Sequence, residues 1–254
     1  MHRMKRWQWS AAGALALVVA FVPMASAQVA LVIGNSDYSP QCDPTWGDLP
    51  GVVGDVKGKG HAMERGGWNV VVMENLTKQE MLDAIEDNAP ATSPDHKKKY
   101  IVWYAGHGDN TSVGEWVGVD CQLLSPVDLR DALVAAGIAN HTLVILDSCG
   151  GGAFADAVNA IRPSVGFLTS TTGLECAEDD PSYTQCLLDL INGDGDIDQD
   201  GVVTVLEVAN RMNAACDTPG QHGTWDNDFP HHILGTFFAT AVTPATWGTI
   251  KGTF

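Results

Sequence analysis

A histidine and a cysteine each follow an apolar stretch of the chain, and each is flanked by glycine. His107 lies in "KYIVWYAGHG", and Cys149 lies 42 residues later in "HTLVILDSCG". A cysteine attacks a carbonyl carbon as its thiolate, and a neighbouring histidine favours that form by lowering the thiol pKa. The glycines let a substrate backbone approach both side chains closely. These residues therefore predict nucleophilic catalysis at a carbonyl group.

The same segments hold candidates for stabilising the charge that develops on the attacked carbonyl oxygen. We expect the backbone amides of Cys149 and Gly108 to donate to this oxygen as an oxyanion hole. Two alternatives stay open: His107 as a structural residue at a strand end, and Cys149 as half of a disulfide.

Neighbouring strands must position these side chains. Apolar runs predict strands at residues 29–34, 69–75, 99–106, 141–148 and 164–171, and spacing and caps predict helices at 52–67, 77–88 and 125–137. Strands that are apolar throughout favour a parallel sheet covered on both faces, so we expect an α/β fold, a three-layer α/β/α sandwich. Ligands bind beyond the carboxyl ends of such strands, where His107 and Cys149 are expected to meet.

Residues 1–27 have the features of a secretory signal peptide. Three basic residues precede the apolar run "AAGALALVVAFV", and the small residues "ASA" precede Gln28. We expect cleavage there, a secreted or periplasmic protein, and one domain over residues 28–254. An uncleaved anchor is the alternative, although the apolar run is shorter than the ~20 residues that span a bilayer.

The composition is strongly acidic. Without the three basic residues of the leader, 11 basic residues stand against 31 acidic ones, a formal charge of −20. This balance argues against nucleic acid as a partner and favours basic peptides or cations. After signal removal we expect no stable membrane anchor. The oligomeric state is not predicted.

All six cysteines follow the leader, where an exported chain can oxidise them. Cys176 and Cys186 flank an acidic stretch and are the first disulfide we expect. Cys42 and Cys121 are the second. If Cys149 is a nucleophile, an odd number of cysteines remains, so at least one further thiol stays unpaired.

The stretch "DIDQDGVVTVLE" matches an EF-hand calcium loop at residues 196–207. The loop places acidic, carbonyl and hydroxyl oxygens at the ligand positions and glycine at the sharp turn. The expected Ca²⁺ ligands are Asp196, Asp198, Asp200, the carbonyl of Val202, Thr204 and Glu207, with Gly201 at the turn. Helices are expected on both sides of the loop. A chance acidic turn is the alternative.

The histidine and cysteine motifs also resemble those of a known family. "YAGHG" and "DSC" followed by glycine are similar to the two signatures of caspase-like cysteine peptidases, the caspase–metacaspase group with its bacterial metacaspase-like members. "ALVIGNSDY" resembles the first strand of that fold, and "LPGVVGD" resembles a metacaspase segment with Gly54 in place of asparagine. The resemblance extends from about Val29 to Met212.

This resemblance implies a cysteine-type endopeptidase with a His107–Cys149 dyad and a mainly parallel caspase-like sheet. It also implies that Asp147 and Asp55 form an acidic substrate pocket, so that cleavage follows arginine or lysine. A carboxylate pair suits a guanidinium, which bonds bidentately. Gly150, Gly151 and Gly152 depart from the family's usual turn after the cysteine. The alternative function is therefore a catalytically inactive, calcium-binding extracellular module with this fold.

Overall fold

The computed structural model describes residues 28–42, 45–90, 99–162, 165–177, 181–217, 222–225 and 233–236. The expected signal peptide at residues 1–27 lies outside this set. Within the described ranges, no helix combines the length and the apolar character needed to cross a bilayer.

A six-stranded sheet forms the centre of the fold, in the order β10-β8-β7-β3-β1-β2. Its strands are β1 (Gln28–Gly34), β2 (Asn69–Glu74), β3 (Lys99–Ala105), β7 (Thr142–Asp147), β8 (Gly166–Thr169) and β10 (Thr224–Trp225). Only β10 is antiparallel to its neighbour. The five strands expected from the sequence are all present and parallel. The apolar run of β3 is buried along nearly its whole length, because both faces are covered.

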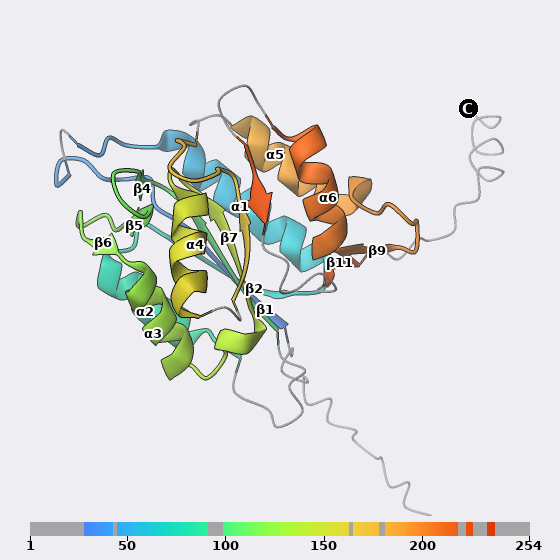
Figure 1. Cartoon of the computed structure of the whole chain (residues 1–254), viewed down its shortest axis with the longest axis horizontal. Coiled ribbons are helices and arrows are strands. Elements are labelled where there is room, and N and C mark those ends of the chain that lie inside the picture. The colour runs from blue at the N-terminus through green and yellow to red at the C-terminus, as the bar shows by residue number, and fades with distance from the viewer. Residues whose placement is uncertain are drawn as a thin grey trace, which may run out of the picture.

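Helices cover the two faces of this sheet, as Figure 1 shows. One face packs against α1 (Pro50–Arg65), α5 (Pro181–Asp189) and α6 (Val205–Ala215). The other packs against α2 (Lys78–Asp87), α3 (Pro126–Ala135) and α4 (Gly151–Ile161). Alternate residues of each strand enter the two cores, Val32 on one side and Leu31 on the other. The predicted three-layer α/β/α sandwich is confirmed.

Several elements were not expected from the sequence. A small sheet joins β4 (Gly108–Asp109), β5 (Glu115–Val117) and β6 (Leu123–Leu124), and a second joins β9 (Val202–Thr204) and β11 (Ile233–Thr236). A 3₁₀ turn, η1 (Ala139–His141), and a π-helical turn, η2 (Leu190–Asp194), complete the described elements. Helix α4 escaped prediction because it begins in a glycine run, and glycine is a poor helix former.

The edge strand β2 differs from the buried strands. All six of its residues are exposed or half-exposed. Its apolar side chains still pack on both cores, Val70 on one face and Val71 and Met73 on the other, so the expected cover of both faces is present but partial at this edge.

Two disulfides stabilise the molecule, one expected and one not. Cys42 and Cys121 are bonded, as predicted, with their Cα atoms 5.4 Å apart. The Cys176–Cys186 prediction is wrong, because Cys186 of α5 bonds to Cys216 at the end of α6. Helices α5 and α6 pack against each other, which brings these two cysteines together.

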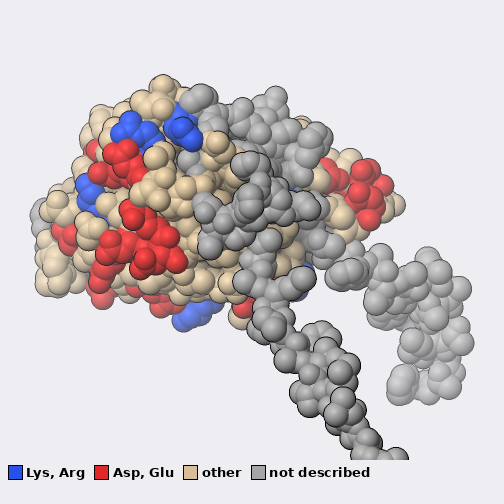
Figure 2. All heavy atoms as spheres, turned by 90° about the horizontal axis from the view of Figure 1, so that it is seen from below, with Lys and Arg blue, Asp and Glu red and all other residues tan. Residues whose placement is uncertain are grey.

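Acidic side chains gather in separate patches on the face drawn in Figure 2. Lysine and arginine are sparse on this face, as the composition of 31 acidic and 14 basic residues requires. Such a surface attracts cations rather than polyanions.

Candidate active site

Strands β3 and β7 lie side by side, and their carboxyl ends open into one pocket. The register pairs Ala105 of β3 with Asp147 of β7, so both strands end at the same level of the sheet. His107 follows β3, Cys149 follows β7, and both side chains line a pocket of about 280 Å³. The structure thus brings together the histidine and cysteine that the sequence singled out.

A backbone carbonyl and two aromatic rings orient the His107 side chain. Its Nε2 lies 2.7 Å from the carbonyl oxygen of Gly47. The ring centroids of Tyr38 and Trp46 lie 4.7 and 5.2 Å from the imidazole centroid. A carbonyl oxygen only accepts hydrogen bonds, so Nε2 carries a proton, and in the neutral ring Nδ1 is the basic nitrogen. The contact with Gly47 therefore selects the tautomer that a general base needs.

Cys149 lies between the end of β7 and the start of α4, and its thiol is half-buried. It forms no disulfide, and its Sγ donates a weak hydrogen bond to the carbonyl oxygen of Ala177 at 3.9 Å. Burial, followed by the hydrogen bond and charge of the neighbouring Cys176 thiol, raises the pKa of Cys149 to about 12. The sequence led us to expect a lowered pKa. In this state the thiol is protonated at neutral pH.

Glycines beside Cys149 allow backbone segments to touch. A Cβ atom on Gly108 would overlap the carbonyl oxygen of Cys149, so these two backbones are in direct contact. Gly150 has a φ of +70°, and a Cβ there would lie 2.6 Å from the Cα of Gly114. The glycine turn after Cys149 is therefore closely packed against the loop before β5.

Asp147 is paired with a lysine that the sequence analysis did not single out. Lys59 of α1 places Nζ 3.0 Å from Asp147 Oδ2, and its side chain is 0 % exposed against 17 % for Asp147. Thr184 of α5 donates a second hydrogen bond to the same oxygen. Burial opposes ionisation of Asp147, but the charge of Lys59 and these hydrogen bonds outweigh it and hold the pKa of the carboxyl below its ordinary value.

Asp55 also reaches the pocket that His107 and Cys149 line. It is half-exposed and lies one turn before Lys59 on α1. The structure therefore brings together both acidic residues expected in the pocket, Asp55 and Asp147, and adds a buried cation beside them.

The acidic loop at residues 196–207 brings three carboxylates together. One oxygen each from Asp196, Asp198 and Glu207 lies within 4.8 Å of the others. Ca²⁺ binds oxygen at 2.3–2.6 Å, so two ligands of one ion lie at most about 5 Å apart, and these three fit. Burial opposes ionisation of Glu207, but hydrogen bonds from Thr204 and the loop amides lower its pKa. The charged form that a cation requires is therefore favoured.

The other expected loop ligands make local contacts. Asp200 Oδ1 accepts from the amide of Val202 at 2.8 Å. The Thr204 hydroxyl donates to Glu207 Oε2 at 2.8 Å and caps α6. Gly201 has a φ of +85°, which the sharp turn requires. The expected helices stand on both sides, α5 with η2 before the loop and α6 after it.

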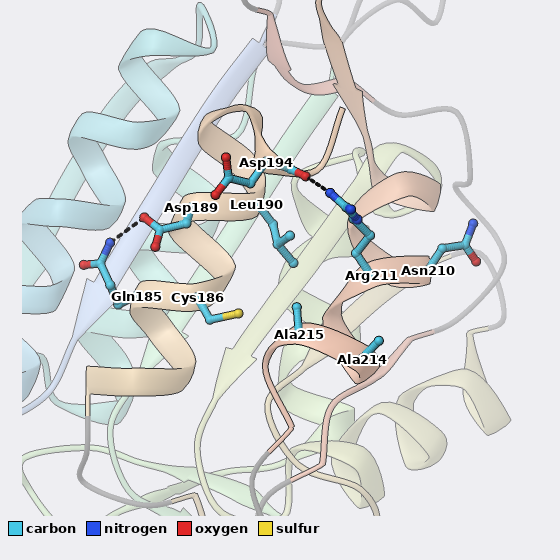
Figure 3. A pocket seen from close by; sticks show the side chains of 9 residues that line it. All are labelled: Gln185, Cys186, Asp189, Leu190, Asp194, Asn210, Arg211, Ala214 and Ala215. Carbon is cyan, nitrogen blue, oxygen red and sulfur yellow. Dashed lines mark hydrogen bonds between the residues drawn. The ribbon is translucent and has the colours of Figure 1, made fainter. Parts of the chain in front are cut away.

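A larger hollow of about 780 Å³ lies between α5, η2 and α6 (Figure 3). Figure 3 shows Gln185 bonded to Asp189, at 2.7 Å, and Arg211 bonded to the carbonyl oxygen of Asp194. Neither His107 nor Cys149 lines this hollow. This hollow is therefore separate from the pocket that His107 and Cys149 line.

Four contributors to the smaller pocket escaped the sequence analysis: Gly47, Lys59, Cys176 and Thr184. Gly47 acts through its carbonyl, which any residue type has. Cys176 and Thr184 reach the pocket from segments that follow β8. The position of Lys59 could have been predicted, because its four-residue spacing from Asp55 places both residues on one face of a helix.

A family model described as a caspase domain matches residues 27–225 of the chain. No curated protein matches the chain significantly. The matched range contains the whole pocket and the acidic loop.

Proposed function

Because the chain belongs to the caspase-domain family of cysteine peptidases, we propose that it is an exported endopeptidase with Cys149 as nucleophile and His107 as general base. The observation that carries the proposal is the single pocket lined by both side chains at the ends of adjacent parallel strands. The Gly47 carbonyl, 2.7 Å from Nε2, supports the role of His107 by leaving Nδ1 as the proton acceptor.

The raised pKa of Cys149 implies that proton transfer accompanies attack. His107 takes the thiol proton as Sγ bonds to the scissile carbonyl carbon, and the C–N bond then breaks as His107 returns the proton to the leaving amine. A water molecule, deprotonated by His107, attacks the thioester and releases the acid product and the thiol. The charge that forms on sulfur lies next to the N-terminus of α4, which favours anions.

Backbone donors support the oxyanion step. The contact between Gly108 and the Cys149 backbone supports the proposal that both amides donate to one developing oxyanion. Removing one such donor typically lowers kcat by about 10²–10³.

Export and calcium binding form the second part of the proposal. Two disulfides suit an oxidising compartment, in agreement with the signal peptide expected at residues 1–27. The converging carboxylates of Asp196, Asp198 and Glu207 support Ca²⁺ as the bound cation. When bound, the ion would fix the turn between η2 and α6.

The third part concerns substrate choice. Asp55 and Asp147 line the catalytic pocket, which supports a metacaspase-like preference for arginine or lysine before the cleaved bond. The partner is then a peptide or protein with basic residues.

Hydrolysis of short reporter peptides that end in arginine, lysine or aspartate tests the proposal, with and without Ca²⁺. Cys149→Ala should abolish cleavage and His107→Ala should lower it at least 10³-fold, both with unchanged circular dichroism. His61→Ala removes an exposed histidine of α1 and should leave activity intact. Calcium binding by a wild type that cleaves no peptide would instead support the inactive calcium-binding module.

A further inference from the structure

Lys59 is a fully buried cation in the wall of the catalytic pocket. Its side chain is 0 % exposed, and its Nζ lies 3.0 Å from Asp147 Oδ2 and 5.3 Å from the ring centroid of Trp103. Lysine is rarely buried to this degree without a paired charge. Lys59 therefore occupies the place beside Asp147 that a positively charged substrate side chain would otherwise fill.

This pairing changes what Asp147 can offer to a substrate. Its Oδ2 already accepts from Lys59 and from the Thr184 hydroxyl. A guanidinium needs both oxygens of a carboxylate for bidentate bonding. The positive charge of Lys59 also offsets the negative charge of Asp147, so the pair attracts a further cation weakly.

Asp55 remains as the other acidic side chain of the pocket. With Lys59 and Asp147, it gives the three ionisable side chains a formal charge of −1. Asp55 is half-exposed and lies one turn from Lys59 on α1. The negative charge that these side chains offer to a basic substrate is therefore small.

We propose that Lys59 is a specificity-determining residue that occupies Asp147 in place of a substrate cation, so that Asp147 contributes little to the selection of a basic side chain. This inference rests on the proposed peptidase function. It implies that arginine is preferred only modestly over citrulline, its uncharged analogue of nearly the same shape. It also implies that lysine is accepted about as well as arginine, because two-point recognition of a guanidinium at Asp147 is lost.

The test compares kcat/KM for matched peptides with arginine or citrulline before the cleaved bond. Lys59→Met removes the internal cation and frees Asp147, so the arginine-to-citrulline ratio should rise at least tenfold. Lys57→Met is the matched control, because Lys57 lies on the same helix with its side chain 62 % exposed. It should leave the ratio at the wild-type value. An equal ratio in both variants would overturn the inference.

Lys59→Met also leaves Asp147 buried without its partner, which can prevent folding. The double variant Lys59→Met/Asp147→Asn removes both charges and avoids this difficulty. Its ratio should stay near the wild-type value, because Asp55 is unchanged. A ratio near one would show that Asp147 itself recognises the substrate and would refute the proposal.

A binding measurement separates this inference from the proposed catalysis. In Cys149→Ala backgrounds, calorimetry follows benzamidine, an arginine-like cation, in the Lys59→Met, Lys57→Met and double variants. Affinity should rise at least tenfold in Lys59→Met and stay unchanged in the other two. A wild type that cleaves nothing would refute the peptidase, whereas unaltered benzamidine affinity in Lys59→Met would refute the role of Lys59.

Discussion

Cys149 and Cys176 line the same pocket as His107, and neither cysteine is in a disulfide. Their segments also meet through the backbone, since Cys149 Sγ donates to the carbonyl oxygen of Ala177. The neighbouring Cys176 thiol makes ionisation of Cys149 less favourable, because two thiolates cannot share one small site without repulsion.

Alkylation of Cys149 should therefore depend steeply on pH. Because its pKa is raised to about 12, the rate with iodoacetamide should climb through pH 9 and beyond without a plateau. Cys176→Ala removes one cause of the raised pKa and should shift the rate profile to lower pH. Mass mapping at Cys149 measures the rate in both proteins, and the urea-unfolded protein supplies the profile of an ordinary thiol. A native plateau by pH 8 would contradict the raised pKa.

Asp55→Asn should weaken the preference for basic peptides. A half-exposed carboxylate contributes ~1 kcal/mol to such an ion pair, so the arginine-to-citrulline ratio should fall about fivefold. Asp55→Glu keeps the charge and should restore most of the ratio. Asp156→Asn changes an exposed acid of α4 and serves as the control. Cleavage after citrulline should hardly change, and an equal loss on both peptides would exclude a role in selectivity.

Calcium should raise the melting temperature of the metal-free protein by about 5–10 °C at one hundred times its Kd. Asp196→Ala should remove this rise without changing the calcium-free value much. Glu207→Ala should remove it and also lower the calcium-free value, because Glu207 caps α6. Scanning calorimetry measures the melting temperature of each variant with and without calcium, and Asp189→Ala serves as a control outside the loop. A full calcium response in Asp196→Ala would rule out the loop as the site.

The Cys186–Cys216 disulfide should stabilise the pairing of α5 with α6. It joins residues 30 apart in sequence, for which the chain-entropy estimate is ~3–4 kcal/mol of unfolding free energy. Replacing both cysteines by alanine should lower the urea midpoint accordingly. Replacing Cys176 should not lower it, because Cys176 is free. Peptide mapping without reduction checks the connectivity, and a Cys176–Cys186 peptide would contradict it.

The parallel strands and the His107–Cys149 pocket could be predicted because their signals are local. An apolar run that ends in a glycine-flanked histidine or cysteine identifies both the strand and its functional end, and consecutive strands of a parallel sheet usually meet. The cap at the start of α2, formed by Thr77 and Glu80, is likewise a local signal, since a capping box spans only four residues.

The contacts that tune the pocket could not be predicted in the same way. Lys59 and Asp147 are 88 residues apart. From the sequence alone, a lysine in a glycine-containing helix is predicted to be solvent-exposed, and only the fold shows that it is buried. The prediction for Cys186 was wrong for a related reason. Cys176 was chosen as its partner because the two are close in sequence, whereas the packing of α5 on α6 brings Cys216 to Cys186.

The contact between Gly150 and Gly114 ties the sequence of one loop to that of another. Any side chain at position 150 would require an unfavourable φ of +70° and would collide with the Gly114 Cα, which a Cβ would approach to 2.6 Å. Gly114 has a φ of +71° and is just as restricted. An engineer who wants a different turn after Cys149 must therefore redesign both loops together. Among homologous sequences, the two glycines should be gained or lost as a pair.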